Sequence, residues 1–230
     1  MRIFAISDLH LNGNRDKPMS IFGEYWLNHT SKLITNWNNK VSKKDMVLIP
    51  GDISWAMKWE EVLGDLELLH NLPGKKIFVR GNHDYWWQKI SRLNSLYNDM
   101  FFIQNKAYMC DEIAVCGTRG WICPGKDGFT ANDSKIYHRE LLRLKLSLDD
   151  AMNNHAKEII VMLHYPPTNE GAFSSAFTEL FEQYPVSYVI YGHLHDKHAW
   201  GKNIKGKVGN IIYRLVSADY LEFMPIEIKC

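Results

Sequence analysis

Five short apolar segments, each followed at once by polar residues that can bind a metal ion, constrain this chain more than any other feature. The segments are residues 3–6, 46–49, 77–79, 159–163 and 188–191. A short apolar run bounded by turn-forming residues is typical of a buried strand. Because helical patterns separate these runs, the sequence predicts an α/β protein with a largely parallel core.

Apolar residues at spacings of three and four predict the helices that connect these strands. The expected helices cover residues 26–37, 59–69, 86–97, 137–152 and 176–181. Further short strands are expected at residues 101–103, 107–109 and 113–115, and the apolar tail 211–228 is strand-like. The sequence contains no repeat or linker, so we expect a single domain over residues 1–230.

The polar residues after the apolar segments are predicted to form one site. Open α/β sheets bind ligands beyond the carboxyl ends of their strands, so residues that follow different strands can converge on one edge. Each group alone also suits an ordinary turn or helix cap, but five such groups together favour a functional site. The residues are Asp8, His10, Asp52, Asn82, His83, His164, His193 and His195.

The types of side chain in this set favour two metal ions. One divalent ion cannot use so many nitrogen and oxygen ligands, and Asp52 lies in the middle of the set, where its carboxylate can bridge two ions. Two ions about 3.5–4 Å apart clamp a phosphate and activate water. The two carboxylates leave a positive excess that attracts an anionic substrate, and the absence of thiolates argues against soft-metal or iron–sulfur chemistry.

Charge and cysteine content argue against several other classes of protein. The chain has 230 residues and a net charge of +1, with no block of like charge, so neither a nucleic-acid polymer nor a membrane surface is an expected partner. Its four cysteines lack paired Cys-x-x-Cys spacing, which argues against a zinc ribbon and favours reduced thiols. No apolar run approaches the roughly 20 residues of a membrane span. We therefore expect a soluble, cytoplasmic protein.

The motifs resemble those of the calcineurin-like metallophosphoesterase superfamily, in that family's order and over nearly the whole chain. They are Asp8-x-His10, Gly51-Asp52, Gly81-Asn82-His83-Asp84, His164 and Gly192-His193-Leu194-His195. The resemblance implies two packed mixed β-sheets flanked by helices, in four layers. It also implies two divalent or trivalent transition-metal ions, manganese, iron or zinc.

The same resemblance implies a role for each residue of the site. One ion would be held by Asp8, His10, Asp52 and His195, and the other by Asp52, Asn82, His164 and His193. His83 matches the catalytic histidine, and Asp84 would orient it. In the expected mechanism a metal-bridging hydroxide attacks phosphorus directly, while His83 acts as general acid and protonates the leaving oxygen.

Departures from the phosphoprotein phosphatase branch bear on the substrate. Ile53 follows Asp52 where that branch has the start of Asp-Arg-Gly, and Asp84 follows His83 where it has Glu. We therefore expect a small phosphodiester or phosphomonoester rather than a phosphoprotein. Two alternatives are a non-enzymatic metal-binding scaffold, against which the retained His83 argues, and a nuclease, which usually needs a more basic surface.

The sequence allows two interpretations for several residues near the motifs. Arg119, between two glycines, suits a substrate-phosphate clamp or a surface turn. The tryptophans near the motifs could stack on a substrate ring, although packing in the core is the more frequent role. They are Trp55, Trp86, Trp87 and Trp121.

Overall fold

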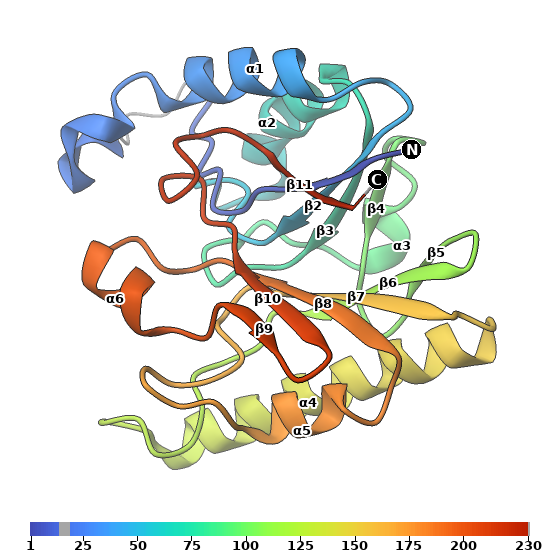
Figure 1. The fold of residues 1–230 in the computed structure, drawn as a ribbon. Coiled ribbons are helices and arrows are strands. Elements are labelled where there is room, and N and C mark those ends of the chain that lie inside the picture. The colour runs from blue at the N-terminus through green and yellow to red at the C-terminus, as the bar shows by residue number, and fades with distance from the viewer. Residues whose placement is uncertain (14–18, 230) are drawn as a thin grey trace.

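Two stacked β-sheets form the centre of the protein, and helices cover both outer faces (Figure 1). The structure is a computed structural model and describes residues 1–13 and 19–229. The helices, of which the first two are 3-10 helices, are η1 (Met19–Phe22), η2 (Glu24–Trp26), α1 (His29–Lys40), α2 (Trp59–Asn71), α3 (Ile90–Leu93), α4 (Ala131–Asn153), α5 (Ala176–Phe181) and α6 (Lys197–Lys202). The strands are β1 (Ile3–Ala5), β2 (Met46–Pro50), β3 (Lys75–Val79), β4 (Met100–Phe102), β5 (Tyr108–Cys110), β6 (Ile113–Thr118), β7 (Glu158–Leu163), β8 (Val186–Tyr191), β9 (Gly206–Val208), β10 (Ile211–Leu215) and β11 (Ile226–Lys229).

Both sheets have a parallel centre, as the alternation of strands and helices predicted. The five-stranded sheet has the order β11-β1-β2-β3-β4, and only β11 is antiparallel to its neighbour. The six-stranded sheet has the order β5-β6-β7-β8-β10-β9, and its antiparallel strands β5 and β9 lie at the edges. The two mixed sheets with flanking helices confirm the predicted fold class.

Continuous apolar runs form the central strands because both faces of each sheet are buried. In β2, Met46 and Leu48 point into the layer between the sheets, whereas Val47 and Ile49 pack under the helices α1 and α2. Side chains in a strand alternate between faces, so each run serves two apolar layers. Burying a side chain such as Leu48 contributes about 1.5–3 kcal/mol, and the stacking of the sheets is therefore driven by ordinary hydrophobic burial.

The same alternation in β7 builds the other side of the fold. Ile160 and Met162 belong to the layer between the sheets, and Val161 and Leu163 pack against α4 and α5. Figure 1 shows these two helices below the six-stranded sheet and α1 and α2 above the five-stranded sheet. The result is the four-layer arrangement that the resemblance implied.

Helix α4 begins where its sequence provides a cap. The Thr130 hydroxyl accepts a hydrogen bond from the Asp133 amide, and the Asp133 carboxylate accepts one from the Thr130 amide. The helix also carries charged residues, including Arg139 and Arg143. Among residues 1–13 and 19–229, no helix is both long and apolar enough to cross a membrane.

Three predicted elements differ from those observed. The helix expected over 86–97 is reduced to α3, because Trp86 lies in a turn and its indole donates to Asp84 instead of continuing a helix. The strand-like tail 211–228 is divided into β10 and β11, since residues 216–225 turn at the edge where the two sheets end. The first helix begins at His29, and Trp26 belongs to η2.

Candidate metal centre

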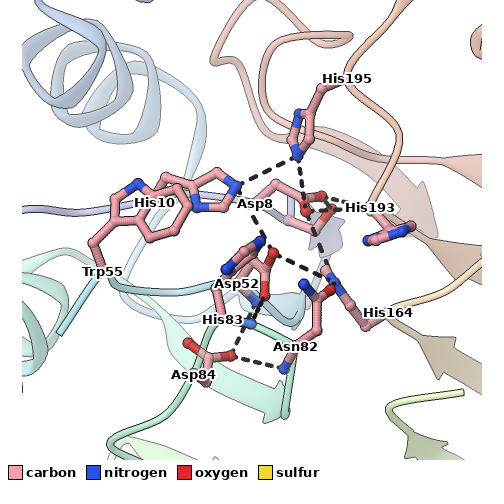
Figure 2. A network of polar contacts seen from close by, with 12 residues as sticks. Asp8, His10, Asp52, Trp55, Asn82, His83, Asp84, His164, His193 and His195 are labelled. Carbon is pink, nitrogen blue, oxygen red and sulfur yellow. Dashed lines mark hydrogen bonds and ion pairs between the residues drawn. The ribbon is translucent and has the colours of Figure 1, made fainter. Parts of the chain in front are cut away.

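The residues after five strands meet at one edge of the stacked sheets, as the sequence predicted. Asp8 and His10 follow β1, and Asp52 follows β2. The remaining predicted ligands follow β3, β7 and β8 and are Asn82, His164, His193 and His195. Figure 2 shows Asp8 and Asp52 at the centre, with His10 on one side and His164 and His193 on the other.

One compact group of possible ligands consists of Asp8, His10 and His195. The Nε2 atoms of His10 and His195 lie 3.4 Å apart, and His195 Nε2 lies 3.5 Å from Asp8 Oδ1. Burial alone would lower the pKa of His195, but hydrogen bonds to Asp219 and Asp8 raise it to about 10. The position between the two carboxylates therefore attracts a positive charge, and a metal ion supplies one.

A second compact group consists of Asp8, Asp52 and His164. The Nδ1–H of His164 donates to the carbonyl of Pro50 at 3.1 Å, which leaves Nε2 with a free lone pair. That nitrogen lies 2.6 Å from Asn82 Oδ1 and 3.4 Å from Asp52 Oδ2, although both oxygens are acceptors.

The protonation of His164 fits a metal ligand. Burial lowers the pKa of His164 to about 4, so the ring is neutral at pH 7. Three acceptor atoms that point at one another are unfavourable unless a cation lies among them. The residues present therefore fit a metal ion at this position.

Asp52 belongs to the second group and also lies near His10 of the first, whereas Asp8 belongs to both groups. The Oδ2 of Asp52 is 3.8 Å from His10 Nε2 and 3.4 Å from His164 Nε2, while its Oδ1 accepts the His83 amide at 2.9 Å. Burial and the nearby carboxylates of Asp84 and Asp8 raise the pKa of Asp52 well above its usual value. This location suits a carboxylate that bridges two ions.

His193 takes part through its backbone as well as its ring. Its amide donates to both carboxylate oxygens of Asp8, at 3.1 and 3.0 Å. The ring packs against Tyr165, with centroids 4.0 Å apart, and lies 5.0 Å from the ring of His164. His193 thus orients Asp8 and lies next to the second group, although it belongs to neither compact group.

Two glycines permit these carboxylates to approach the backbone. A Cβ atom on Gly81 would lie 2.1 Å from Asp52 Oδ1, and one on Gly192 would lie 2.2 Å from Asp8 Oδ2. Contacts this short are impossible for a side-chain carbon. The glycines of the two motifs are therefore required by packing against the predicted ligands.

Strained backbone also concentrates here. Asp8, His10, Asp52 and His193 have φ angles of 57°, 45°, 51° and 72°, in the left-handed region. Such a conformation costs about 1–3 kcal/mol per residue and persists where the surroundings impose it, often at functional sites. It turns each chain sharply after its strand and directs the side chains to the common centre.

His83 lies beside the ligands and faces the same cavity. This cavity has a volume of about 180 Å³, and its lining includes His83, His10 and Asp52. The ring of Trp55 is stacked on His10 with centroids 4.7 Å apart and lies 4.5 Å from the ring of His83. Trp55 thus packs against site residues, whereas Trp86 is fully buried in the core.

Asp84 differs from the expectation that it orients His83. Its carboxylate accepts hydrogen bonds from four backbone amides, those of Asp52, Ile53, Ser54 and Gly81, and from the Trp86 indole. The His83 ring is not among these donors. Burial raises the pKa of Asp84 to about 6 against the effect of the amides. The carboxylate thus joins the loop after β2 to the loop after β3, because it is the acceptor that all these buried donors share.

Asp219 is a site residue that the sequence did not reveal. Its Oδ1 lies 3.1 Å from His195 Nδ1, so it orients the ring and leaves Nε2 for a metal ion. It follows the apolar strand β10 and lies within residues 211–228, which the sequence predicts to be strand-like. The only available signal was this placement after a strand, the pattern shared by the predicted ligands.

Arg119 lies near the site but not among the ligands. Its carbonyl accepts from the amides of His164 and Tyr165, and its guanidinium lies 4.5 Å from the ring centroid of Trp121. A role in holding the substrate phosphate stays a prediction.

Comparisons of sequence and of structure relate this chain to known proteins. An archaeal relative, the uncharacterized protein MJ1445 of Methanocaldococcus jannaschii, is 33% identical over 129 residues, which are 54% of this chain and 68% of the relative. A protein of unknown function from Aquifex aeolicus, AQ665, superposes with a TM-score of 0.52 at 16% identity, over 98% of this chain and 95% of its own, and so shares the fold. The family model described as calcineurin-like phosphoesterase matches residues 1–197. The chain therefore belongs to the calcineurin-like phosphoesterase family.

Proposed function

We propose that this protein hydrolyses a small phosphodiester or phosphomonoester with the help of two metal ions. The observation that carries the proposal is the position of the Asp52 carboxylate, which lies near His10 of one ligand group and near His164 of the other. When bound, the two ions, manganese, iron or zinc, neutralise the phosphate oxygens and activate the attacking water. One would be held by Asp8, His10, Asp52 and His195, and the other by Asp52, Asn82, His164 and His193.

The protein's own residues prepare this centre. The carbonyl of Pro50 and the carboxylate of Asp219 hold two imidazoles with Nε2 directed inward. The two buried carboxylates, Asp8 and Asp52, offset only part of the charge of two divalent ions. The remaining positive potential favours an anionic phosphoester over a neutral substrate.

His83 is the proposed general acid. Its amide is tied to Asp52 Oδ1, and its ring is next to Trp55 in the cavity that also contains His10. A ring held there can donate a proton to the leaving oxygen, which typically contributes about 10²–10⁴-fold to the rate. The scaffold alternative predicts no such turnover.

The shape of the cavity supports a small substrate. Its volume is about 180 Å³, and apolar side chains from Met19, Phe22 and Trp26 line one side together with Trp55. An apolar or aromatic leaving group fits this lining, since aromatic side chains stack on such groups.

The direct test combines metal analysis with a substrate panel. Protein purified without chelator should contain two transition-metal ions per chain and turn over small synthetic diesters or monoesters, but phosphoserine peptides poorly. One ion or fewer in a metal-replete sample would exclude the dinuclear centre. Metal binding without turnover of any ester would favour the scaffold instead.

A further inference from the structure

A second cavity lies beside the candidate metal centre, and arginine dominates its lining. Its volume is about 160 Å³, whereas a buried water needs only about 10–15 Å³. The charged residues that line it are Arg80, Arg119, Arg139, Arg143 and Glu140. None of the predicted metal ligands is among the described residues that line it, so this space is distinct from the metal centre.

The lining has more positive charge than its single carboxylate can balance. Glu140 is 1% exposed, and its Oε1 lies 2.9 Å from Arg143 Nη1, 3.4 Å from Arg139 Nε and 3.6 Å from Arg119 Nη2. Four arginines against one glutamate leave three net positive charges around the cavity, while the whole chain has a net charge of only +1. Such a concentration attracts an anion.

Buried polar atoms of the lining also lack partners. Arg119 Nε and Trp87 Nε1 are buried donors without a hydrogen-bond acceptor in the described part of the chain, and Asn105 Oδ1 is a buried acceptor without a donor. Buried polar groups are nearly always hydrogen-bonded, and leaving them unpaired is unfavourable. A ligand that carries several acceptor oxygens and one proton would satisfy all three.

We propose that this cavity binds a phosphate group in addition to the one at the metal centre. Phosphate presents several acceptor oxygens to the planar guanidinium groups, which bind it through paired hydrogen bonds. Its hydrogen phosphate form also has a proton for Asn105 Oδ1. Glu140 serves to hold the arginines in place, because its carboxylate contacts Arg119, Arg139 and Arg143 at once.

The cavity is joined to the metal-ligand loops through the backbone. Arg80 Nε donates to the carbonyl of Asp84 at 3.1 Å, and Arg80 is two residues before Asn82. The carbonyl of Arg119 accepts from the His164 amide at 3.0 Å. The phosphate group bound here can therefore belong to a substrate that carries a second phosphate or to a free ion.

Calorimetric titration with inorganic phosphate tests the proposal. The metal-loaded protein should show two classes of site, one abolished by a chelator and one that survives it. Arg143→Gln should weaken the chelator-resistant class by about tenfold, since it removes one charge-assisted hydrogen bond. Lys145→Gln is the matched control, because it removes a charge from the same helix at a residue paired with Asp149 outside the cavity.

The outcomes separate this proposal from the proposed function. If no chelator-resistant class exists, or if Lys145→Gln weakens it as much as Arg143→Gln, the cavity is not a phosphate site. A chelator-resistant class without any metal-dependent one would retain this site and contradict the dinuclear centre.

Kinetics identify the source of the phosphate group. If it belongs to the substrate, Arg143→Gln raises KM about tenfold for an ester with a second phosphate and leaves KM unchanged for the same ester without it. If it is a free ion, both KM values stay unchanged while phosphate affinity falls. A rise in both KM values would show that Arg143 acts on the metal centre, contrary to the proposal.

Discussion

The two sheets contribute different chemistry to the candidate metal centre. The five-stranded sheet supplies both central carboxylates, Asp8 and Asp52, together with Asn82 and the two imidazoles of His10 and His83. The six-stranded sheet supplies only imidazoles, from His164, His193 and His195, and then orients one of them with Asp219.

This difference shows why the site depends on the packing of the sheets. The carboxylates of one sheet are buried and close together, which is unfavourable until cations or the imidazoles of the other sheet approach them. Asp52 is in contact range of ligands from both sides, His10 and His164. The following predictions test this division of roles.

Loss of Asp52, the proposed bridging carboxylate, should have the largest effect. Asp52→Asn is expected to remove both metal ions and nearly all turnover, because the Asp52 carboxylate lies near His10 on one side and His164 on the other. Asp8→Asn is the matched comparison and should mainly weaken the binding of one ion. Metal content by elemental analysis checks this, and equal loss of a single ion in both variants would contradict a bridging role for Asp52.

His83→Ala should retain the metal ions but lose about 10²–10⁴-fold in turnover of an ester with a poor leaving group. For a nitrophenyl ester the loss should shrink markedly, since that leaving group needs no proton. The measurement is the rate against leaving groups of graded basicity. A defect that is independent of the leaving group, or loss of a metal ion, would show that His83 is not the general acid.

Asp84→Asn should act on stability rather than on proton transfer. Its carboxylate accepts four backbone amides and the Trp86 indole, and an amide nitrogen in place of one oxygen opposes some of these donors. We expect the free energy of unfolding to fall by about 3 kcal/mol. Urea unfolding measures this, with the exposed Asp111→Asn as control. An unchanged midpoint with a leaving-group-dependent rate would restore the role of orienting His83.

Asp219→Ala should lower the affinity for the metal ion next to His195 by about 10–100-fold. Partners that orient a ligating histidine typically contribute this much to metal affinity. The exposed Glu60→Ala is the control for general effects of charge. Competition with a chromophoric chelator measures the affinity. If the affinities for both ions fall equally, Asp219 acts on the whole site and not through His195.

The smallest effect is expected far from the metal centre. Although burial opposes it, hydrogen bonds from Arg2 and Ser42 hold the pKa of Asp45 well below its usual range. The ionised carboxylate therefore stabilises the fold above about pH 4, and this contribution is lost as the pH falls further.

Asp45→Ala should accordingly lower the free energy of unfolding by about 2 kcal/mol at pH 7, and by less as the pH falls below about 4. Urea unfolding of both proteins over this range provides the check. A difference that stays constant with pH would show that packing, and not charge, stabilises this contact.

The sequence by itself predicted the fold class and the set of residues that meet at the site. Short apolar runs that alternate with helical patterns are sufficient for a parallel core, and a polar residue after each run marks the edge where ligands bind. The glycines of the motifs were visible in the sequence too. Only the structure explains why no other residue fits at position 81, because a Cβ added to Gly81 would lie 2.1 Å from Asp52 Oδ1.

Only the tertiary structure decided which partners these residues take. Asp84 contacts the loop after β2 instead of the neighbouring His83, and Asp219, which lies 24 residues after His195 in the turn that follows β10, reaches the His195 ring. Four arginines from three separate elements enclose one cavity. Such contacts depend on how loops fold over the edge of two packed sheets, and the periodicity of apolar residues carries no information about the direction of a loop side chain.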